Sequence, residues 1–274
     1  MSTAVAVFHG RFGRASLYRL NRPLAPHAHR EGHLIFLIDG APAAVGVDGK
    51  EYRVDRHHAV AVSPWQPHDF RPSDFGQGAV FLTLYIAPRW FMEASSQIGH
   101  VMMRFGAPSI EMTPDLAGLL SRAAEGLSEG EATSRLLGTI QELTETAFEH
   151  TWAIGKRAPP IWPRMSDFRI RNAIRLMNER VTDACVLDRI ARDSGLSRPH
   201  FYKLFRQNIG LTPNMYLNTL RLERSIDRLT HSDDPVTAIG LDLGFASQAS
   251  FTRFFSNNIG ISPTDYRRVS MVTA

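Results

Sequence analysis

The sequence predicts a two-domain α+β protein, in which a β-barrel with packed helices precedes an all-helical domain. Three observations lead to this prediction. Short apolar segments separated by turn residues fill the first third of the chain, apolar residues at helical spacing dominate the rest, and a proline-rich segment divides the two parts. With 274 residues, of which 43% are hydrophobic, the chain is long enough for two domains with separate cores.

Residues 17–87 have the pattern of short strands. The apolar runs HLIFLI (33–38) and AAVGV (43–47) each end at an Asp-Gly pair, and EYRV (51–54), AVAVS (59–63) and AVFLTLYIA (79–87) follow. An Asp-Gly pair between apolar runs predicts a tight turn, because glycine tolerates the positive φ that such turns need. Many short strands at regular spacing favour a β-barrel or sandwich.

The same region contains a cluster of histidines, in which His27, His29 and His33 lie within seven positions and His68 follows in PWQPHDF. Three interpretations are open: a pocket for a small-molecule effector, a metal site, or ordinary core and surface histidines. Strand parity places His27, His29, His33, Ile35 and Leu37 on one face. We therefore expect an effector pocket, without a metal or another cofactor, lined by His27, His29, His33, Ile35, Trp65 and His68.

After about residue 113 the apolar spacing becomes helical, with Leu136, Ile140, Leu143 and Ala147 on one stripe. This stripe can pack on its own barrel or against a second copy of the chain. The segment GKRAPPIWPRMS (155–166) then contains three prolines. Because proline restricts both itself and the residue before it, this segment is predicted to be an interdomain linker.

The C-terminal part contains an internal repeat. IARDSGLSRPHFYKLFRQNIGLTPNMY (190–216) recurs as IGLDLGFASQASFTRFFSNNIGISPTDY (239–266). Each copy has a short apolar helix, a glycine turn, a second helix, a second glycine, and a Thr-Pro or Ser-Pro pair that starts a further helix. The glycines are Gly195, Gly210, Gly244 and Gly260. Two helices joined by such a turn are typical of the helix-turn-helix, whose second helix lies in the DNA major groove.

The second helix of each copy has one buried and one outward face. Phe201, Leu204 and Phe205 are predicted to be buried in the first copy, and Phe251, Phe254 and Phe255 in the second. The outward residues are our candidates for DNA contact, because arginine and lysine suit guanine, glutamine suits adenine, and small groups suit the thymine methyl. They are Arg198, Pro199, Tyr202, Lys203, Arg206, Ser247, Gln248, Ala249, Thr252 and Arg253.

The charge is consistent with a polyanionic partner. From Arg164 onward the chain carries 16 Lys and Arg against 11 Asp and Glu, whereas the preceding part is close to neutral. An alternative is a helical adaptor that binds protein rather than DNA, and salt-dependent DNA binding would distinguish the two.

The repeat and its connecting helix resemble the AraC/XylS family of bacterial transcription regulators, and HAHREGHLIFLIDG resembles the cupin-like sensor domain that many of them carry. The resemblance implies a transcription regulator, not an enzyme, with double-stranded DNA and a small-molecule effector as partners. It further implies a homodimer formed through the helix at residues 136–147, and contact with RNA polymerase if the protein is an activator. The implied domains are 1–155 for sensing and dimerisation, 156–166 as linker, and 167–274 for DNA binding.

The chain departs from the family pattern at two places. Ser256 and Asn257 follow Phe255, where basic residues are usual, and His33 stands where metal-binding cupins usually have glutamate. Related sensor barrels mostly bind an organic effector without a metal. The alternative function is a metal-dependent cupin enzyme, or a metal sensor, fused to a DNA-binding domain.

The N-terminal sequence MSTAVAVFHGRFGR lacks the pattern of a signal peptide, and Cys185 is the single cysteine. Both features predict a cytoplasmic protein.

Overall fold

The computed structural model describes residues 2–94, 103–130, 134–154, 167–182 and 186–272. The predicted linker, 156–166, and Cys185 lie outside these residues. The described chain forms two compact units: the first holds the residues up to Ile154 and those from Ser256 onward, and the second holds Asp167–Phe255. Among the described helices, none has the length and apolarity needed to cross a bilayer.

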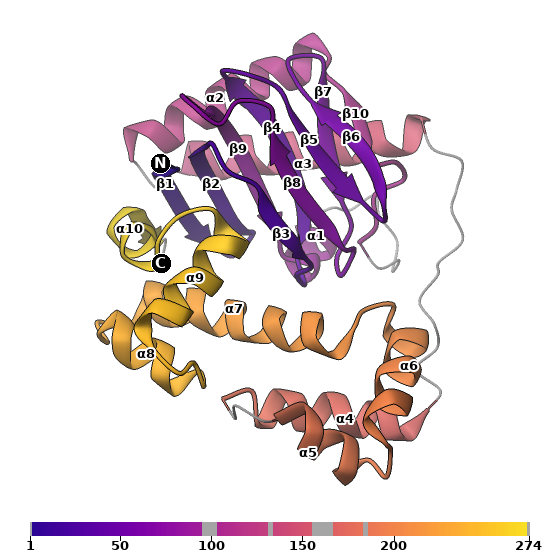
Figure 1. Cartoon of the computed structure of the whole chain (residues 1–274). Coiled ribbons are helices and arrows are strands. Elements are labelled where there is room, and N and C mark those ends of the chain that lie inside the picture. The colour runs from indigo at the N-terminus through magenta and orange to yellow at the C-terminus, as the bar shows by residue number, and fades with distance from the viewer. Residues whose placement is uncertain (1, 95–102, 131–133, 155–166, 183–185, 273–274) are drawn as a thin grey trace. The chain divides into compact units, whose positions relative to one another are not determined.

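The first unit contains two sheets (Figure 1). The seven-stranded sheet has the order β10-β7-β4-β9-β2-β1-β11, and the four-stranded sheet has the order β3-β8-β5-β6. Strand bounds are β1 Thr3–Gly10, β2 Gly13–Leu20, β3 Leu24–His27, β4 Gly32–Asp39, β5 Ala43–Val47, β6 Lys50–Val54, β7 His58–Val62, β8 His68–Pro72, β9 Ala79–Ile86, β10 Ser109–Glu111 and β11 Ser270–Val272. The five predicted strands correspond to β4, β5, β6, β7 and β9, with ends within one residue of the prediction.

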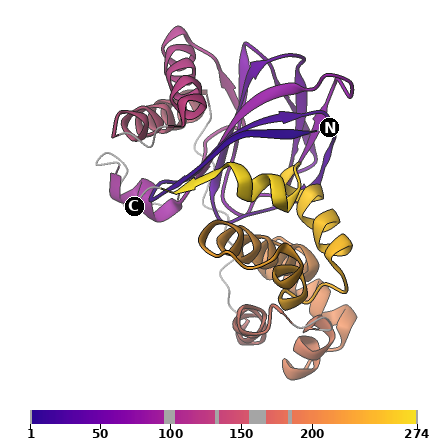
Figure 2. The same ribbon diagram turned by 90° about the vertical axis from the view of Figure 1, so that its left-hand side faces the viewer.

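Strand β4 shows how this unit is layered, because side chains alternate between the two faces of a strand. Leu34 and Phe36 join the core that lies between the large sheet and the helices, whereas His33 and Ile35 face the interior between the sheets. Helices α1 (Pro88–Ala94), α2 (Pro114–Glu129) and α3 (Ser134–Ile154) belong to this unit, and Figure 2 shows α2 and α3 outside the barrel.

The stripe on α3 belongs to this same core. Leu136, Ile140, Leu143 and Ala147 are all buried within the protomer, packed together with α2 and the large sheet. The prediction that this stripe forms a dimer interface is therefore wrong as to the surface: its apolar side chains already have a partner in their own chain.

The end of the chain also belongs to the first unit. Helix α10 (Pro263–Val269) leads into β11, which pairs in parallel with β1 so that Ser270 lies opposite Val7. Strand β1 is thereby covered on both edges, by β2 and β11. An edge strand exposes unpaired backbone groups, so this pairing satisfies part of β1 that would otherwise face solvent.

The second unit is helical, as predicted. It contains α4 Phe168–Glu179, α5 Val186–Asp193, α6 Arg198–Ile209, α7 Pro213–His231, α8 Val236–Asp242 and the first two turns of α9 Gln248–Ile259. The glycine turns have the expected left-handed backbone, with φ of 68° at Gly195 and 82° at Gly244. Thr212 caps α7 through its side chain, whereas Ser197 occupies the N-cap position of α6 without a side-chain bond.

Candidate functional sites: two recognition helices and a buried histidine cluster

Helices α6 and α9 are the second helices of the two repeats, and they bury most of the predicted faces, although Leu204 and Phe254 are only half-buried. Phe201, Phe205, Phe251 and Phe255 are fully buried. The outward residues lie at the surface: Arg198, Pro199, Lys203, Arg206, Ser247, Gln248, Ala249 and Arg253 are exposed, and Tyr202 and Thr252 are half-buried. All ten candidate DNA contacts are therefore accessible, in two sets on corresponding helix faces.

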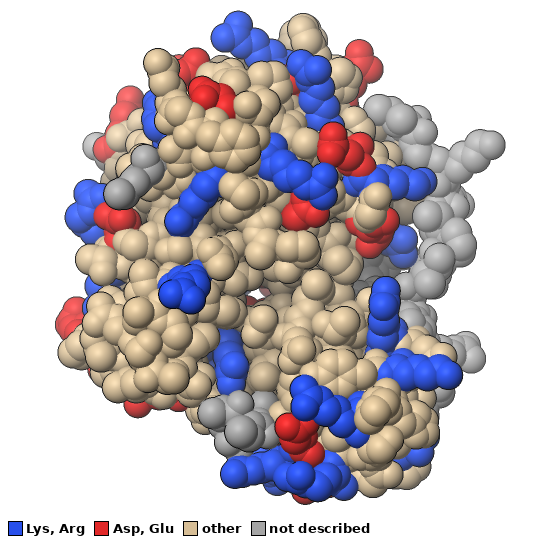
Figure 3. Space-filling model, in the orientation of Figure 1, with Lys and Arg blue, Asp and Glu red and all other residues tan. Residues whose placement is uncertain are grey.

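The outward residues differ in how strongly they are held. Arg198 forms an ion pair of 3.2 Å with Asp188, and Gln248 accepts a 2.5 Å hydrogen bond from Thr237. Among the described residues, Lys203 and Arg253 have no ion-pair or hydrogen-bond partner. In Figure 3, Lys and Arg side chains gather over the helices at the lower right, which Figure 1 labels α4, α5 and α6. Free cations on recognition helices are suited to phosphate or guanine contact.

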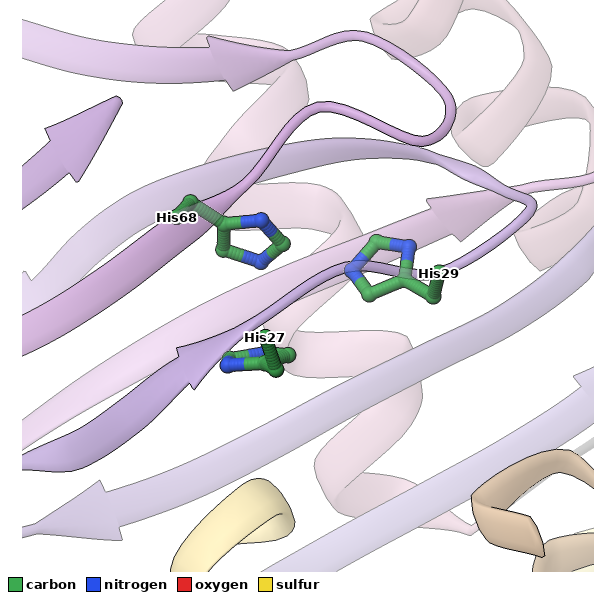
Figure 4. Close-up of side chains that lie close together, drawn as sticks. All are labelled: His27, His29 and His68. Carbon is green, nitrogen blue, oxygen red and sulfur yellow. The ribbon is translucent and has the colours of Figure 1, made fainter. Parts of the chain in front are cut away.

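The histidine cluster lies in the first unit and draws on three strands (Figure 4). His27 ends β3 and pairs with His68 at the start of β8, His29 lies in the connection from β3 to β4, and His33 is the second residue of β4. All four rings are buried, with 4–6% of each residue exposed. The fold thus brings together four histidines that are up to 41 positions apart in the sequence.

The orientation of three of these rings is fixed by backbone carbonyls. His27 Nδ1 lies 2.7 Å from the carbonyl oxygen of Ala25, His29 Nδ1 lies 3.0 Å from that of Glu31, and His68 Nδ1 lies 2.9 Å from that of Gln66. The Nε2 atoms of His29 and His68 lie on the side toward His33, at 3.3 and 3.2 Å from its Nδ1. The candidate ligand nitrogens of His27, His29 and His68 lie within 4.8 Å of one another.

The rings are held in their neutral form. Burial lowers the pKa of His27, and lowers the pKa values of His29, His33 and His68 well below the usual range, because a charged ring would lose its hydration. The guanidinium of Arg14 adds to this effect on His27, His29 and His33. Four neutral imidazoles are four potential metal ligands.

The cavity beside the cluster is small. Its volume is about 20 Å³, and its lining includes His27, His33, His68 and Ile35 from the predicted pocket. His29 and Trp65 are not among the lining residues, and the Trp65 ring lies 5.7 Å from the guanidinium of Arg30. Ile259, at the end of α9, does contribute to the lining. Nothing in the local sequence connects Ile259 to a barrel cavity.

Arg14 and Tyr85 adjoin the cluster, and the sequence did not single them out. The Tyr85 ring stacks on His33 at 4.4 Å with an 18° interplanar angle, and the Arg14 guanidinium lies 3.7 Å from the centre of the Tyr85 ring. Arg14 also donates a 3.0 Å hydrogen bond to the hydroxyl of Tyr266 in α10. An arginine in an alternating strand is expected to be exposed, so its burial could be found only in the structure.

The comparisons with known proteins cover both units. Residues 17–142 match a family model described as an AraC-like ligand binding domain, and residues 190–269 match one described as a helix-turn-helix domain. The HTH-type transcriptional activator RhaS of Escherichia fergusonii is 35% identical over 103 residues, which make up 38% of this chain and 37% of that protein. RhaS of Salmonella arizonae is 22% identical over 261 residues, or 91% of this chain and 90% of that protein.

An uncharacterised HTH-type transcriptional regulator of Haemophilus influenzae is 30% identical over 104 residues, which make up 38% of this chain. The chain therefore spans only 35% and 37% of the lengths of this regulator and of the Escherichia RhaS. Among solved structures, fatty acid-bound ToxT of Vibrio cholerae has a TM-score of 0.57 at 11% identity, with 93% of this chain and 94% of that chain covered. At this identity the likeness establishes the fold alone.

Proposed function

We propose that the chain is a transcription regulator of the AraC type, that it binds DNA at specific sequences, and that its barrel holds the ligand that controls this binding. The observation that carries the proposal is the duplicated unit, which presents corresponding helix faces of α6 and α9 with ten accessible residues. Lys203 and Arg253 stand out on these faces, because each has a charge that no other described side chain neutralises.

The direct test is DNA binding. Fragments selected by the purified protein from a random library identify the preferred sequence, and fluorescence anisotropy then compares this sequence with random DNA. Arg253→Ala is expected to weaken specific binding by about 1–3 kcal/mol and to relax the preference at one base pair, if Arg253 contacts a base. Equal weakening on both DNAs would instead assign Arg253 to a phosphate contact.

A matched control is Arg122→Ala, because Arg122 is an exposed arginine on α2, outside the recognition helices. This variant is expected to bind both DNAs as the unaltered protein does. Absence of any sequence preference, in the unaltered protein at low salt, would contradict the proposed function.

The remaining partners belong to the same proposal. We expect a homodimer, with an interface elsewhere than the buried stripe of α3, and contact with RNA polymerase if the protein activates transcription as its RhaS relatives are named to do. A DNA-binding regulator of this kind acts in the cytoplasm.

We infer no catalytic role for the barrel, because a cavity of about 20 Å³ has no room for a substrate.

A further inference from the structure

The hydrogen bonds of the buried histidines determine which ring nitrogens carry hydrogen. A carbonyl oxygen only accepts, so the Nδ1 atoms of His27, His29 and His68 must donate to their backbone carbonyls. In a neutral ring the Nε2 atom then carries a lone pair. The cluster therefore contains three Nε2 lone pairs, on rings whose candidate ligand nitrogens lie within 4.8 Å of one another.

His33 cannot donate a hydrogen bond to all three of these lone pairs. Its Nδ1 lies 3.3 Å from Nε2 of His29 and 3.2 Å from Nε2 of His68, so it can donate one hydrogen to one of them. Its own Nε2 is buried and has no hydrogen-bond partner among the described residues. At least two of the three lone pairs thus lack a donor from the cluster, and buried acceptors without donors are costly.

A metal ion would satisfy this arrangement. Nitrogen ligands lie about 2.0–2.1 Å from Zn²⁺ in a tetrahedral site, which places them about 3.3 Å from one another. The distances of 3.3 and 3.2 Å from His33 Nδ1 to its two neighbours already have this value. Each carbonyl that accepts from Nδ1 also acts as the outer partner that orients a metal-binding imidazole and raises its basicity.

The size of the space also favours an ion over an organic effector. Pockets for organic ligands usually hold about 300–1,000 Å³, whereas one water molecule needs about 10–15 Å³. The cavity here is about 20 Å³. The Glu31 carboxylate, 3.7 Å from His29 Nδ1, places a negative charge next to the cluster.

We propose that His27, His29, His33 and His68 bind one divalent transition-metal ion of the kind that prefers imidazole ligands, such as Zn²⁺, Ni²⁺ or Fe²⁺. Its role as the regulatory ligand rests on the function proposed above, whereas the binding of the metal does not. The sequence led us to expect an effector pocket without a metal; the ring orientations and the cavity volume, which only the structure shows, favour this alternative.

The first experiment measures metal in the full chain, purified without an affinity tag. The chain is loaded with excess Zn²⁺ and dialysed, and elemental analysis is expected to find about one ion per chain, with a higher melting temperature than after chelation. Co²⁺ is the second probe, because the intensity of its visible absorption reports four-coordinate binding. No retained metal and no Co²⁺ spectrum would overturn the proposal.

Variants locate the site. His29→Gln and His68→Gln are each expected to weaken Zn²⁺ binding at least tenfold, since loss of even an outer partner of a ligand weakens binding about 10–100-fold. His57→Gln is the matched control, because His57 is exposed and outside the cluster, and it should bind as the unaltered protein does. If a ligand variant does not fold, the stoichiometry and spectrum of the unaltered chain still decide the outcome.

The anisotropy assay, with and without Zn²⁺, separates this proposal from the proposed function. Sequence-specific DNA binding by a chain that retains no metal would overturn the metal site and leave the regulator intact. A metal-loaded chain without any DNA preference would overturn the regulator and leave the metal site intact.

Discussion

Arg14 keeps a positive charge inside the first unit, and Tyr266 is the residue that accepts a hydrogen bond from it. The distance from Arg14 Nη1 to the Tyr266 hydroxyl is 3.0 Å, and both residues are buried. Tyr266→Phe keeps the ring but removes the acceptor, so we expect the free energy of unfolding to fall by about 1–3 kcal/mol. Urea denaturation measures this loss, and Tyr52→Phe, at a half-exposed tyrosine in β6, is the control.

The effect of Tyr266→Phe should depend on pH. Burial raises the pKa of Tyr266 to about 12, so the unfolded chain loses this proton first, near its ordinary value of about 10. The stabilisation is fully present below about pH 10 and is lost as pH rises through about 12. The difference between the two proteins should therefore narrow over this range. A difference that stays constant would mean that Tyr266 ionises alike in both states.

At the same scale, the sequence predicted part of the histidine site. His27 and His33 lie in strands β3 and β4, where side-chain alternation applies, whereas His29 joins the cluster from the connection between these strands. Strand parity could not reveal the ring orientations, because these depend on contacts with backbone carbonyls two residues away, those of Ala25 and Gln66. Trp65, with a backbone φ of 62°, lies outside regular strand geometry, and its place in the effector site stays a prediction.

At the scale of elements, the N-caps of α6 and α7 provide a matched comparison. The Thr212 hydroxyl accepts from the Met215 backbone N–H, whereas Ser197 makes no side-chain cap bond. Thr212→Ala is expected to destabilise the protein by about 1 kcal/mol, and Ser197→Ala by less. Thermal or chemical denaturation of both variants measures the two losses of stability. Equal losses would show that the difference in capping does not persist in solution.

The turn glycines of the two repeats provide a second comparison. Both have positive φ, so alanine at either position is strained by about 1 kcal/mol or more. A Cβ on Gly244 would also lie 2.2 Å from the carbonyl oxygen of Thr182, whereas one on Gly195 meets nothing within 4 Å. Gly244→Ala should therefore lower stability distinctly more than Gly195→Ala. The reverse order, measured by urea denaturation, would contradict the packing around Gly244.

The elements predicted correctly from the sequence are those with local signals: strands bounded by Asp-Gly, and helices bounded by caps and glycines. Strands β1, β2, β3, β8, β10 and β11 were not predicted, and β11 has no local signal because its partner, β1, is at the other end of the chain. The stripe on α3 was identified as apolar, but periodicity cannot distinguish a dimer interface from a face packed on the protein's own sheet. The buried positions of Leu136 and Ile140 resolve that choice.

At the scale of the whole molecule, a series of contacts joins the histidine cluster to the C-terminal helix, all within the first unit. His33 stacks on Tyr85, the Arg14 guanidinium lies over Tyr85, and Arg14 donates to Tyr266 in α10. Helix α10 follows α9, whose first two turns belong to the helical unit and whose last residues belong to the barrel unit. The series of contacts thus ends at the helix that follows α9 along the chain.

From this series of contacts we predict that Zn²⁺ binding and DNA binding are coupled. If Zn²⁺ binding biases α10 through Arg14, Zn²⁺ should change the DNA affinity of the unaltered chain by about 5–150-fold, the usual range for coupled sites. Tyr266→Phe interrupts this series of contacts at a residue that is not a metal ligand, so the variant should still bind Zn²⁺ and DNA. The factor by which Zn²⁺ changes its DNA affinity should fall toward one. Anisotropy titrations of both proteins, with and without Zn²⁺, measure the factor, with Tyr52→Phe as control. Spatial contact alone does not prove coupling; an unchanged factor in Tyr266→Phe would show that any communication takes a route other than Arg14 and Tyr266.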